Sequence, residues 1–302
     1  MKILYISAAD GPDYLSDMAF HGLRSLYGAD VVDVNRMWFM YQGANLQGLY
    51  GKGFTLYGLI EEGQVDRTDI FRKIAHRFFD LVVFGSIHRC WSYYNEIAGA
   101  YSPDQIIFLD GEDSPSYLRD FTTRGLYFKR ELHNPQKNVI PVQFGIPEEK
   151  ILTGAVEKTA VMAPMDPFNP ATYIYEDEAS YYGQYRSAMF GKTAKKAGWD
   201  CLRHYEIMAC GSIPWFVNLE HCPASIMEDL PKDDLMVAKT LLEYQGLPIF
   251  VKPSGKELWL DLNDRIQRVL REKLTTKALA KRILAIQGES HGKNNAYALC
   301  AS

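Results

Sequence analysis

Short apolar runs along the first half of the chain alternate with longer stretches in which apolar residues recur at helical spacing. The short runs indicate buried strands, and the longer stretches indicate amphipathic helices. Strands and helices in alternation predict a parallel sheet covered by helices. We expect strands over Ile3–Ser7, Val31–Val34, Leu81–Ser86 and Gln105–Leu109, an extended segment over Asn138–Phe144, and helices over Tyr14–Tyr27, Thr68–Phe79 and Tyr93–Tyr101.

This pattern breaks between Gly145 and Lys158, where a Gly-Ile-Pro turn and charged residues precede the next apolar run. At 302 residues the chain exceeds the roughly 250 to 300 at which a single core stops growing. We therefore predict two domains, residues 1–150 and residues 151–302. In the second we expect strands over Thr159–Ala163, Ile213–Val217 and Pro248–Val251, and helices over Ser180–Phe190, Cys201–Cys210, Leu260–Leu274 and Thr276–Ile286.

Two tyrosine-rich segments stand out from this pattern. Tyr41–Gly58 is also rich in glycine and is predicted to be a loop, and long loops in compact domains are often functional. Tyr173–Tyr185 is predicted to be a loop that leads into an amphipathic helix with aromatic packing.

Composition and charge exclude several classes of protein. Hydrophobic residues make up 47% and charged residues 23%, which is ordinary for a globular protein. The net charge of -4 argues against an extended polyanion as the main partner. The five cysteines form no Cys-x-x-Cys pair, so neither a disulfide framework nor a zinc site is indicated, and a cytoplasmic location fits. We expect no integral membrane segment, and any membrane association would be peripheral.

The richest chemistry lies between Phe190 and Phe216. Asp200 is placed to cap a helix, and Gly211 is placed to end that helix in a left-handed conformation. The start of such a helix attracts a diphosphate, and cationic side chains nearby would add donors. These side chains are Lys192, Lys195, Lys196 and Arg203.

Glu206 follows Arg203 by one helical turn, so both residues lie on the same face of the predicted helix. A carboxylate in that position can accept hydrogen bonds from both hydroxyls of a ribose. The alternative is a surface ion pair between Arg203 and Glu206, which would have no functional meaning.

The string from Arg203 to Pro214 resembles the R-x-x-E-x-x-A-x-G-x-x-P signature of GT-B glycosyltransferases, in particular the CgeB-like and exostosin-like groups. The resemblance implies an α/β fold of GT-B type, with two Rossmann-like domains facing a cleft and C-terminal helices. It also implies that Glu206 holds the ribose and Arg203 the diphosphate of a nucleotide sugar. The predicted nucleotide-sugar-binding residues are Lys192, Lys196, Trp199, Asp200, Arg203, His204 and Glu206.

Candidates for proton transfer come from the first half. Ligand groups gather at the carboxyl ends of parallel strands, which is where Asp13, His88 and Asp110 are expected. An inverting transferase needs a group that takes the proton from the acceptor hydroxyl, and these three are the catalytic candidates. The alternative for His88 is a structural role beside Arg89 and Trp91.

A second interpretation concerns the run of carboxylates after the strand that ends at Leu109. Asp110 and Glu112 resemble the metal-binding Asp-x-Asp of GT-A glycosyltransferases, and carboxylates at that spacing can hold a divalent cation. The structural alternative is that Asp113 or Ser114 caps a helix beginning at Pro115.

The sequence thus predicts transfer of a sugar from a nucleotide diphosphate sugar, with UDP-sugars favoured, to an acceptor hydroxyl. The nucleotide sugar is a co-substrate, and the GT-B interpretation requires no cofactor and no metal. The acceptor stays open among a glycan, a lipid-linked glycan, a protein and a modified nucleic-acid base. A protein that binds nucleotide sugars or carbohydrate without turnover is the alternative from another class.

Overall fold

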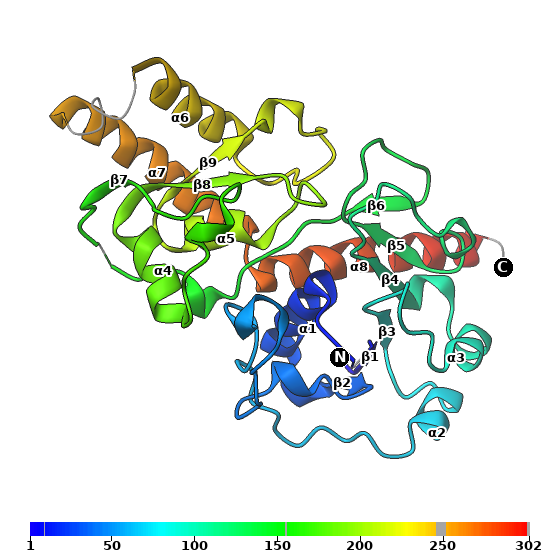
Figure 1. Ribbon diagram of the computed structural model, residues 1–302. Coiled ribbons are helices and arrows are strands. Elements are labelled where there is room, and N and C mark those ends of the chain that lie inside the picture. The colour runs from blue at the N-terminus through cyan, green and yellow to red at the C-terminus, as the bar shows by residue number, and fades with distance from the viewer. Residues whose placement is uncertain (9, 155, 246–251, 301–302) are drawn as a thin grey trace.

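The structure, a computed structural model, describes residues 1–8, 10–154, 156–245 and 252–300. It consists of two α/β lobes, each built on its own parallel sheet (Figure 1). The first lobe contains the six-stranded sheet with helices α1, α2, α3 and α8. The second lobe contains the three-stranded sheet with helices α4, α5, α6 and α7. The prediction of an α/β fold with Rossmann-like parallel sheets is confirmed at this level.

The sheet of the first lobe is parallel throughout and has the strand order β2-β1-β3-β4-β5-β6. Its strands are β1 (Ile3–Ile6), β2 (Val31–Val34), β3 (Leu81–Phe84), β4 (Ile106–Asp110), β5 (Leu126–Lys129) and β6 (Val139–Pro141). The helices between these strands are α1 (Tyr14–Tyr27), α2 (Ile70–Ala75) and α3 (Tyr94–Ala100).

Both faces of this sheet are buried, which explains why its strands are continuous apolar runs. Ile3 and Tyr5 of β1 belong to the apolar cluster that contains α1 and α8. Leu4 and Ile6 point to the opposite face and pack with α2 and α3. Alternate residues of one strand therefore serve two different cores.

The second sheet is also parallel, with the order β7-β8-β9. Its strands are β7 (Ala160–Met162), β8 (Ala188–Ala194) and β9 (Ile213–Val217). The helices of this lobe are α4 (Glu178–Arg186), α5 (Leu202–Ala209), α6 (Lys232–Gln245) and α7 (Pro253–Lys273).

One sequence prediction in this lobe is wrong. The helix expected to reach Phe190 ends at Arg186, and the residues after it form strand β8. A Cβ atom on Gly191 would lie only 2.9 Å from Ile207, so the central strand needs this glycine to let α5 approach. The sequence pattern also missed α6. The strand predicted over Pro248–Val251 lies outside the described residues.

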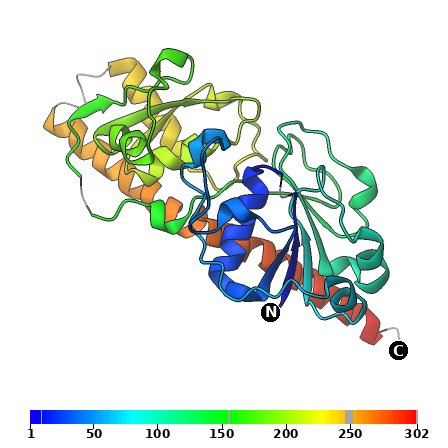
Figure 2. The same cartoon turned by 60° about the horizontal axis from the view of Figure 1, so that its bottom comes forward.

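Helix α8 (Thr276–Cys300) returns to the first lobe and packs along α1 (Figures 1 and 2). Where it begins, the chain passes beside the earlier crossing between the lobes. The Ile146 N–H donates to the Leu274 carbonyl, and the Thr276 N–H donates to the Ile146 carbonyl, both over 2.9 Å. The division of the chain into two domains at residue 150 stays a prediction. Helix α8 belongs to the second half of the sequence but packs against the first lobe.

Gly22 permits the close contact between α1 and α8, because a Cβ at this position would lie 2.0 Å from the Thr276 carbonyl oxygen. We predict that Gly22→Ala lowers the free energy of unfolding by about 1 to 3 kcal/mol, since the backbone of α8 must move to admit the methyl group. Chemical denaturation measures this change.

The matched control is Gly99→Ala in α3, where an added Cβ meets nothing within 4 Å. Alanine is the better helix former, so this variant should be neutral or slightly more stable than the wild type. Equal stability changes for the two variants would contradict the close packing of α1 on α8.

Candidate functional site

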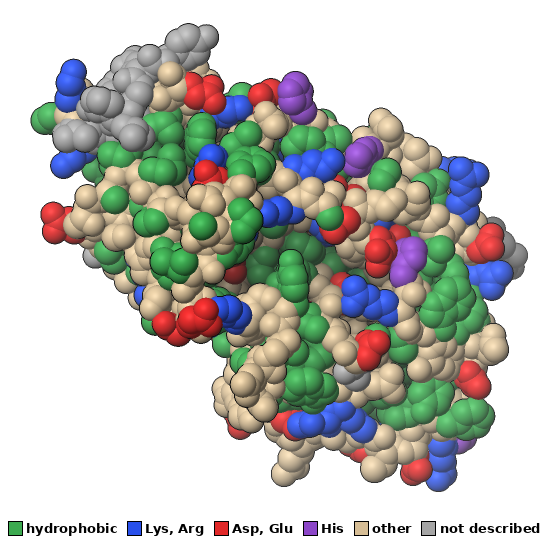
Figure 3. Space-filling model, viewed as in Figure 1, with side chains coloured by type: hydrophobic (Ala, Val, Ile, Leu, Met, Phe, Trp, Pro, Cys, Tyr) green, Lys and Arg blue, Asp and Glu red, His purple; other side chains and the backbone are tan. Residues whose placement is uncertain are grey.

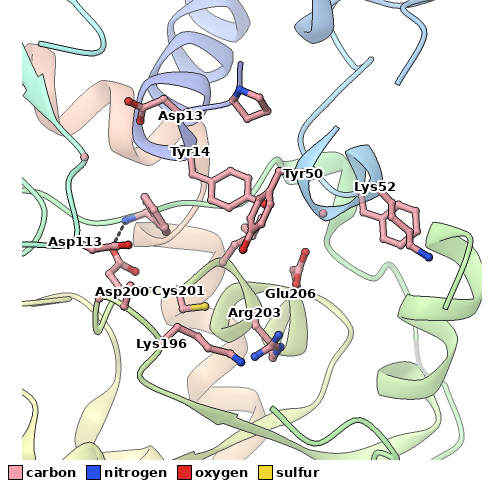
Figure 4. Close-up of a pocket in the computed structure, with 18 of the residues that line it drawn as sticks. Asp13, Tyr14, Tyr50, Lys52, Asp113, Lys196, Asp200, Cys201, Arg203 and Glu206 are labelled. Atoms are coloured by element: carbon pink, nitrogen blue, oxygen red, sulfur yellow. Dashed lines mark hydrogen bonds between the residues drawn. The ribbon is translucent and has the colours of Figure 1, made fainter. Parts of the chain in front are cut away.

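A cleft of about 880 Å³ lies between the two lobes. The space-filling view shows this hollow where the lobes meet (Figure 3). Its first wall comes from the start of α1, the segment around Tyr50 to Phe54, and the residues after β4. Its second wall comes from Lys196 to Glu206 and from the tyrosine-rich segment before α4. The close-up shows side chains of both walls pointing into the cleft (Figure 4).

Helix α5 presents its first turn to this cleft. The prediction for its end is confirmed, because Gly211 is left-handed with φ of 69° and its N–H donates to the Met208 carbonyl over 2.9 Å. The prediction for its start is wrong, because the N-cap residue is Cys201. Asp200 points inward instead and accepts hydrogen bonds from the Phe144 N–H (2.7 Å) and the Tyr205 hydroxyl (2.9 Å).

Asp200 therefore lines the inner end of the cleft as a buried carboxyl that joins the two lobes through Phe144. It is 3% exposed. Burial raises the pKa of Asp200 to about 7, against the opposing effect of the nearby Arg130 guanidinium.

Lys196 and Arg203 converge on one point in the cleft. The Lys196 ammonium and the Arg203 Nη2 both donate to the Tyr173 hydroxyl, each over 3.1 Å. Figure 4 shows their nitrogen atoms side by side. The Arg203 Nε and Nη1 are buried without a hydrogen-bond partner. Lys196 is exposed and Arg203 is half-buried, and within the described ranges no carboxylate forms an ion pair with either cation.

The other three cations on the cleft wall are paired. Lys52 contacts Glu176 over 2.5 Å, Arg89 lies 3.8 Å from Asp13, and Arg130 contacts Asp113. Among the cations that line the cleft, Lys196 and Arg203 are the two without a carboxylate at ion-pair distance in the described ranges, although the charge of Arg203 acts on Glu206. Their positive charge favours an anion at this place.

Glu206 lies one turn after Arg203 and is 6% exposed. Its Oε1 accepts a hydrogen bond from the Thr55 hydroxyl over 2.5 Å, and its Oε2 accepts one from the Tyr181 hydroxyl over 2.6 Å. Burial raises the pKa of Glu206, an effect that these two bonds oppose. The surface ion pair with Arg203 considered above is not what the structure shows.

Three predicted ligands of the nucleotide sugar do not reach the cleft wall. Lys192 pairs with Asp166 over 2.7 Å. Trp199 belongs to the apolar core. His204 is fully buried, with its ring between Thr193 and the Trp199 carbonyl at 2.8 Å on each side, and burial lowers its pKa to about 3. Trp199 and His204 are part of the packing beneath the site.

Among the catalytic candidates, Asp13 is the one that lines the cleft. It is the N-cap of α1, with the Ser16 N–H donating to it over 3.4 Å. The Ser86 hydroxyl donates to its Oδ2 over 2.9 Å. Burial raises the pKa of Asp13, and the Arg89 charge opposes this shift. A carboxylate held in this way can accept a proton at the carboxyl end of the sheet.

Asp110 is completely buried beneath the cleft, and so are Tyr127 and Lys129, two of the residues that hold it. The Tyr127 hydroxyl donates to its Oδ2 over 2.5 Å, and the Lys129 ammonium donates to its Oδ1 over 2.8 Å. The His88 Nε2 lies 3.0 Å from Oδ2. Asp110 and His88 are therefore partners of one another, and neither lines the cleft.

The GT-A interpretation requires the Asp110 carboxylate as a metal ligand. The Lys129 ammonium already donates a hydrogen bond to the Oδ1 of this carboxylate, the oxygen that a metal ion would need. In the part of the chain that the structure describes, no group of three or more His, Cys, Asp and Glu side chains is arranged to hold a metal ion. The helix expected after Asp113 or Ser114 is also wrong, since no helix begins at Pro115. Glu112 contributes its carbonyl oxygen, which accepts a bond from Lys129 over 2.9 Å.

Several residues that line or support the cleft were not predicted from the sequence. Tyr173 accepts hydrogen bonds from Lys196 and Arg203. On the opposite wall, the rings of Tyr14 and Tyr50 lie 5.9 Å apart. Thr55 and Tyr181 donate hydrogen bonds to Glu206. The tyrosine-rich character of both loops was the available signal. It could not separate these rings from those that only pack, such as Tyr185, which is completely buried.

We predict that Asp200→Asn changes how stability depends on pH. Because the pKa of Asp200 is raised in the folded state, folding is favoured while the carboxyl is protonated, and this contribution is lost as the pH rises through about 7. From about pH 5 to about pH 8 the wild type should lose roughly 2 to 3 kcal/mol relative to the variant. Urea denaturation of both proteins at the two pH values measures this difference, and parallel pH profiles would contradict it.

None of the helices in the described ranges combines the length and the apolar character needed to cross a membrane. No model of a known protein family matches the sequence, and a search of curated proteins also finds no match. The resemblance at Arg203–Pro214 therefore stays a prediction.

Proposed function

We propose that the chain is a GT-B glycosyltransferase that moves a sugar from a nucleotide diphosphate sugar, with UDP-sugars favoured, to an acceptor hydroxyl. The observation that supports this most strongly is the pair Lys196 and Arg203. Two cations that form no ion pair with a carboxylate of the described residues meet at the first turn of a helix, inside a cleft between two α/β lobes. Such an arrangement is suited to a diphosphate.

The donor would lie along α5. Its diphosphate would bind where Lys196 and Arg203 now share the Tyr173 hydroxyl, and the unpartnered Arg203 nitrogens would find acceptors in the phosphate oxygens. Glu206, one helical turn further, would bind the ribose. As the sugar leaves, negative charge grows on the diphosphate, and the two cations and the positive end of α5 would stabilise it.

Asp13 would act on the acceptor. In an inverting transfer, the acceptor oxygen bonds to the anomeric carbon while the bond from that carbon to the diphosphate oxygen breaks. The proton of the acceptor hydroxyl passes to the Asp13 carboxylate. The neighbouring aromatic pair Tyr14 and Tyr50 offers flat apolar surfaces against which a sugar can stack.

We predict that Arg203→Ala and Lys196→Ala each weaken binding of UDP by about 10- to 100-fold, because each removes a charge-assisted hydrogen bond. Isothermal titration calorimetry with UDP, GDP and other nucleoside diphosphates, in the presence of EDTA, measures the affinities. The matched control is Lys192→Ala, a lysine paired with Asp166 away from the cleft wall, which should change the affinity less than about twofold. Equal effects of all three substitutions would place the diphosphate elsewhere.

We predict that Asp13→Asn slows transfer by about 10²- to 10⁴-fold and leaves the affinity for UDP unchanged. Asparagine also caps helices, so α1 should keep its start. Release of nucleoside diphosphate from a panel of nucleotide sugars measures turnover. A fully active variant would remove Asp13 from the mechanism. Binding without turnover of any donor by the wild type would instead indicate a protein that binds nucleotide sugars without reacting them.

A further inference from the structure

Residues 50–55, called the strap here, cross the cleft from the first lobe to the second. The strap is anchored at its end by Leu56 and Tyr57, which are buried in the core of the first lobe. On the other side, the Lys52 ammonium donates to the Tyr175 carbonyl over 2.9 Å, and the Phe54 ring lies 5.8 Å from that of Tyr181. Figure 4 shows Tyr50 beside Tyr14 in the cleft and Lys52 further along the same segment.

Thr55 makes the closest contacts of the strap with the second lobe. Its N–H donates to the Glu178 Oε1 over 2.7 Å, and its hydroxyl donates to the Glu206 Oε1 over 2.5 Å. The same hydroxyl lies 2.6 Å from that of Tyr182. Thr55 is 1% exposed, so these three bonds are made out of contact with water, where hydrogen bonds are strong.

The backbone of Thr55 is strained, because its φ is 72° and a β-branched residue rarely adopts the left-handed region. Strain of this kind persists only where the surroundings impose it, and it is common at ligand clamps and switches. The surroundings here are the contacts with Glu178, Tyr182 and Glu206. Loss of the bond to Glu206 would therefore favour release of the strap.

The Thr55 hydroxyl binds to Glu206 as a ribose hydroxyl would, by donating to a carboxylate oxygen. Glu206 is 6% exposed, and both of its oxygens already accept a hydrogen bond. A ribose hydroxyl can take the position that the Thr55 hydroxyl now occupies on Oε1 only if Thr55 leaves. We propose, on the basis of the proposed function, that Thr55 is an affinity-determining residue that competes with the ribose of the donor, and that donor binding releases the strap from the second lobe.

Competition of this kind lowers the apparent affinity for the donor. The apparent dissociation constant equals the intrinsic one divided by the fraction of molecules in which the strap is released. Thr55→Ala removes the competing hydroxyl and leaves Oε1 of Glu206 in need of a donor. We expect this variant to bind UDP several-fold more tightly than the wild type. Thr55→Ser keeps the hydroxyl and is the matched control, with an affinity close to that of the wild type.

Thr55→Gly separates the hydroxyl from the backbone strain, because glycine adopts positive φ without cost. If the hydroxyl is the competitor, the glycine variant binds UDP more tightly, as the alanine variant does. An affinity equal to that of the wild type, although the hydroxyl is gone, would overturn the proposal.

Calorimetry of the four proteins with UDP is combined with hydrogen–deuterium exchange over residues 49–58. The expected result is tighter binding by Thr55→Ala, together with faster exchange of the strap in the wild type when UDP is added. Weaker binding by Thr55→Ala, or protection of the strap by UDP, would overturn the role of Thr55 and leave the proposed function standing. If no nucleoside diphosphate binds to any of the four proteins, the proposed function fails, and the competition fails with it.

Discussion

The relation between the two lobes depends on one place where the chain crosses between them twice. The backbone around Ile146 runs beside Leu274 to Thr276, and two hydrogen bonds join the crossings. A Cβ on Gly145 would lie 2.7 Å from the Thr275 carbonyl, and one on Gly22 would lie 2.0 Å from the Thr276 carbonyl. Glycine at both positions lets α8 enter against α1, and this contact fixes where the walls of the cleft stand.

Charge is distributed unevenly within that cleft. On the first wall, Arg89 and Arg130 are neutralised by Asp13 and Asp113. On the second wall, the hydrogen bonds that Lys196 and Arg203 form within the described part of the chain go to uncharged oxygens. The fields of two paired charges largely cancel at a distance from the pair, so the positive field in the cleft is strongest at the start of α5. An anionic ligand would therefore be drawn to one wall and not to the cleft as a whole.

Glu206 shows why a buried carboxylate at such a site needs a partner before any ligand arrives. A carboxylate removed from water is costly unless hydrogen bonds compensate for the lost hydration. Thr55 and Tyr181 supply that compensation from two different lobes. The side chain that is suited to hold a ribose thus also holds the lobes together, and stability and binding compete for the same oxygen.

The sequence alone determined the elements whose formation depends on local periodicity. Helix α1 and strand β9 have the predicted bounds, and Gly211 ends α5 as expected, because helix and strand patterns and left-handed glycines are local properties. Tertiary structure decided the rest. Asp200 does not cap α5 and instead accepts a hydrogen bond from Phe144, 56 residues away in the sequence. Glu206 accepts one from Thr55, at a separation of 151 residues. Which side chains form hydrogen bonds depends on their distance in space and on their burial. The pattern of residues along the sequence contains neither of these quantities.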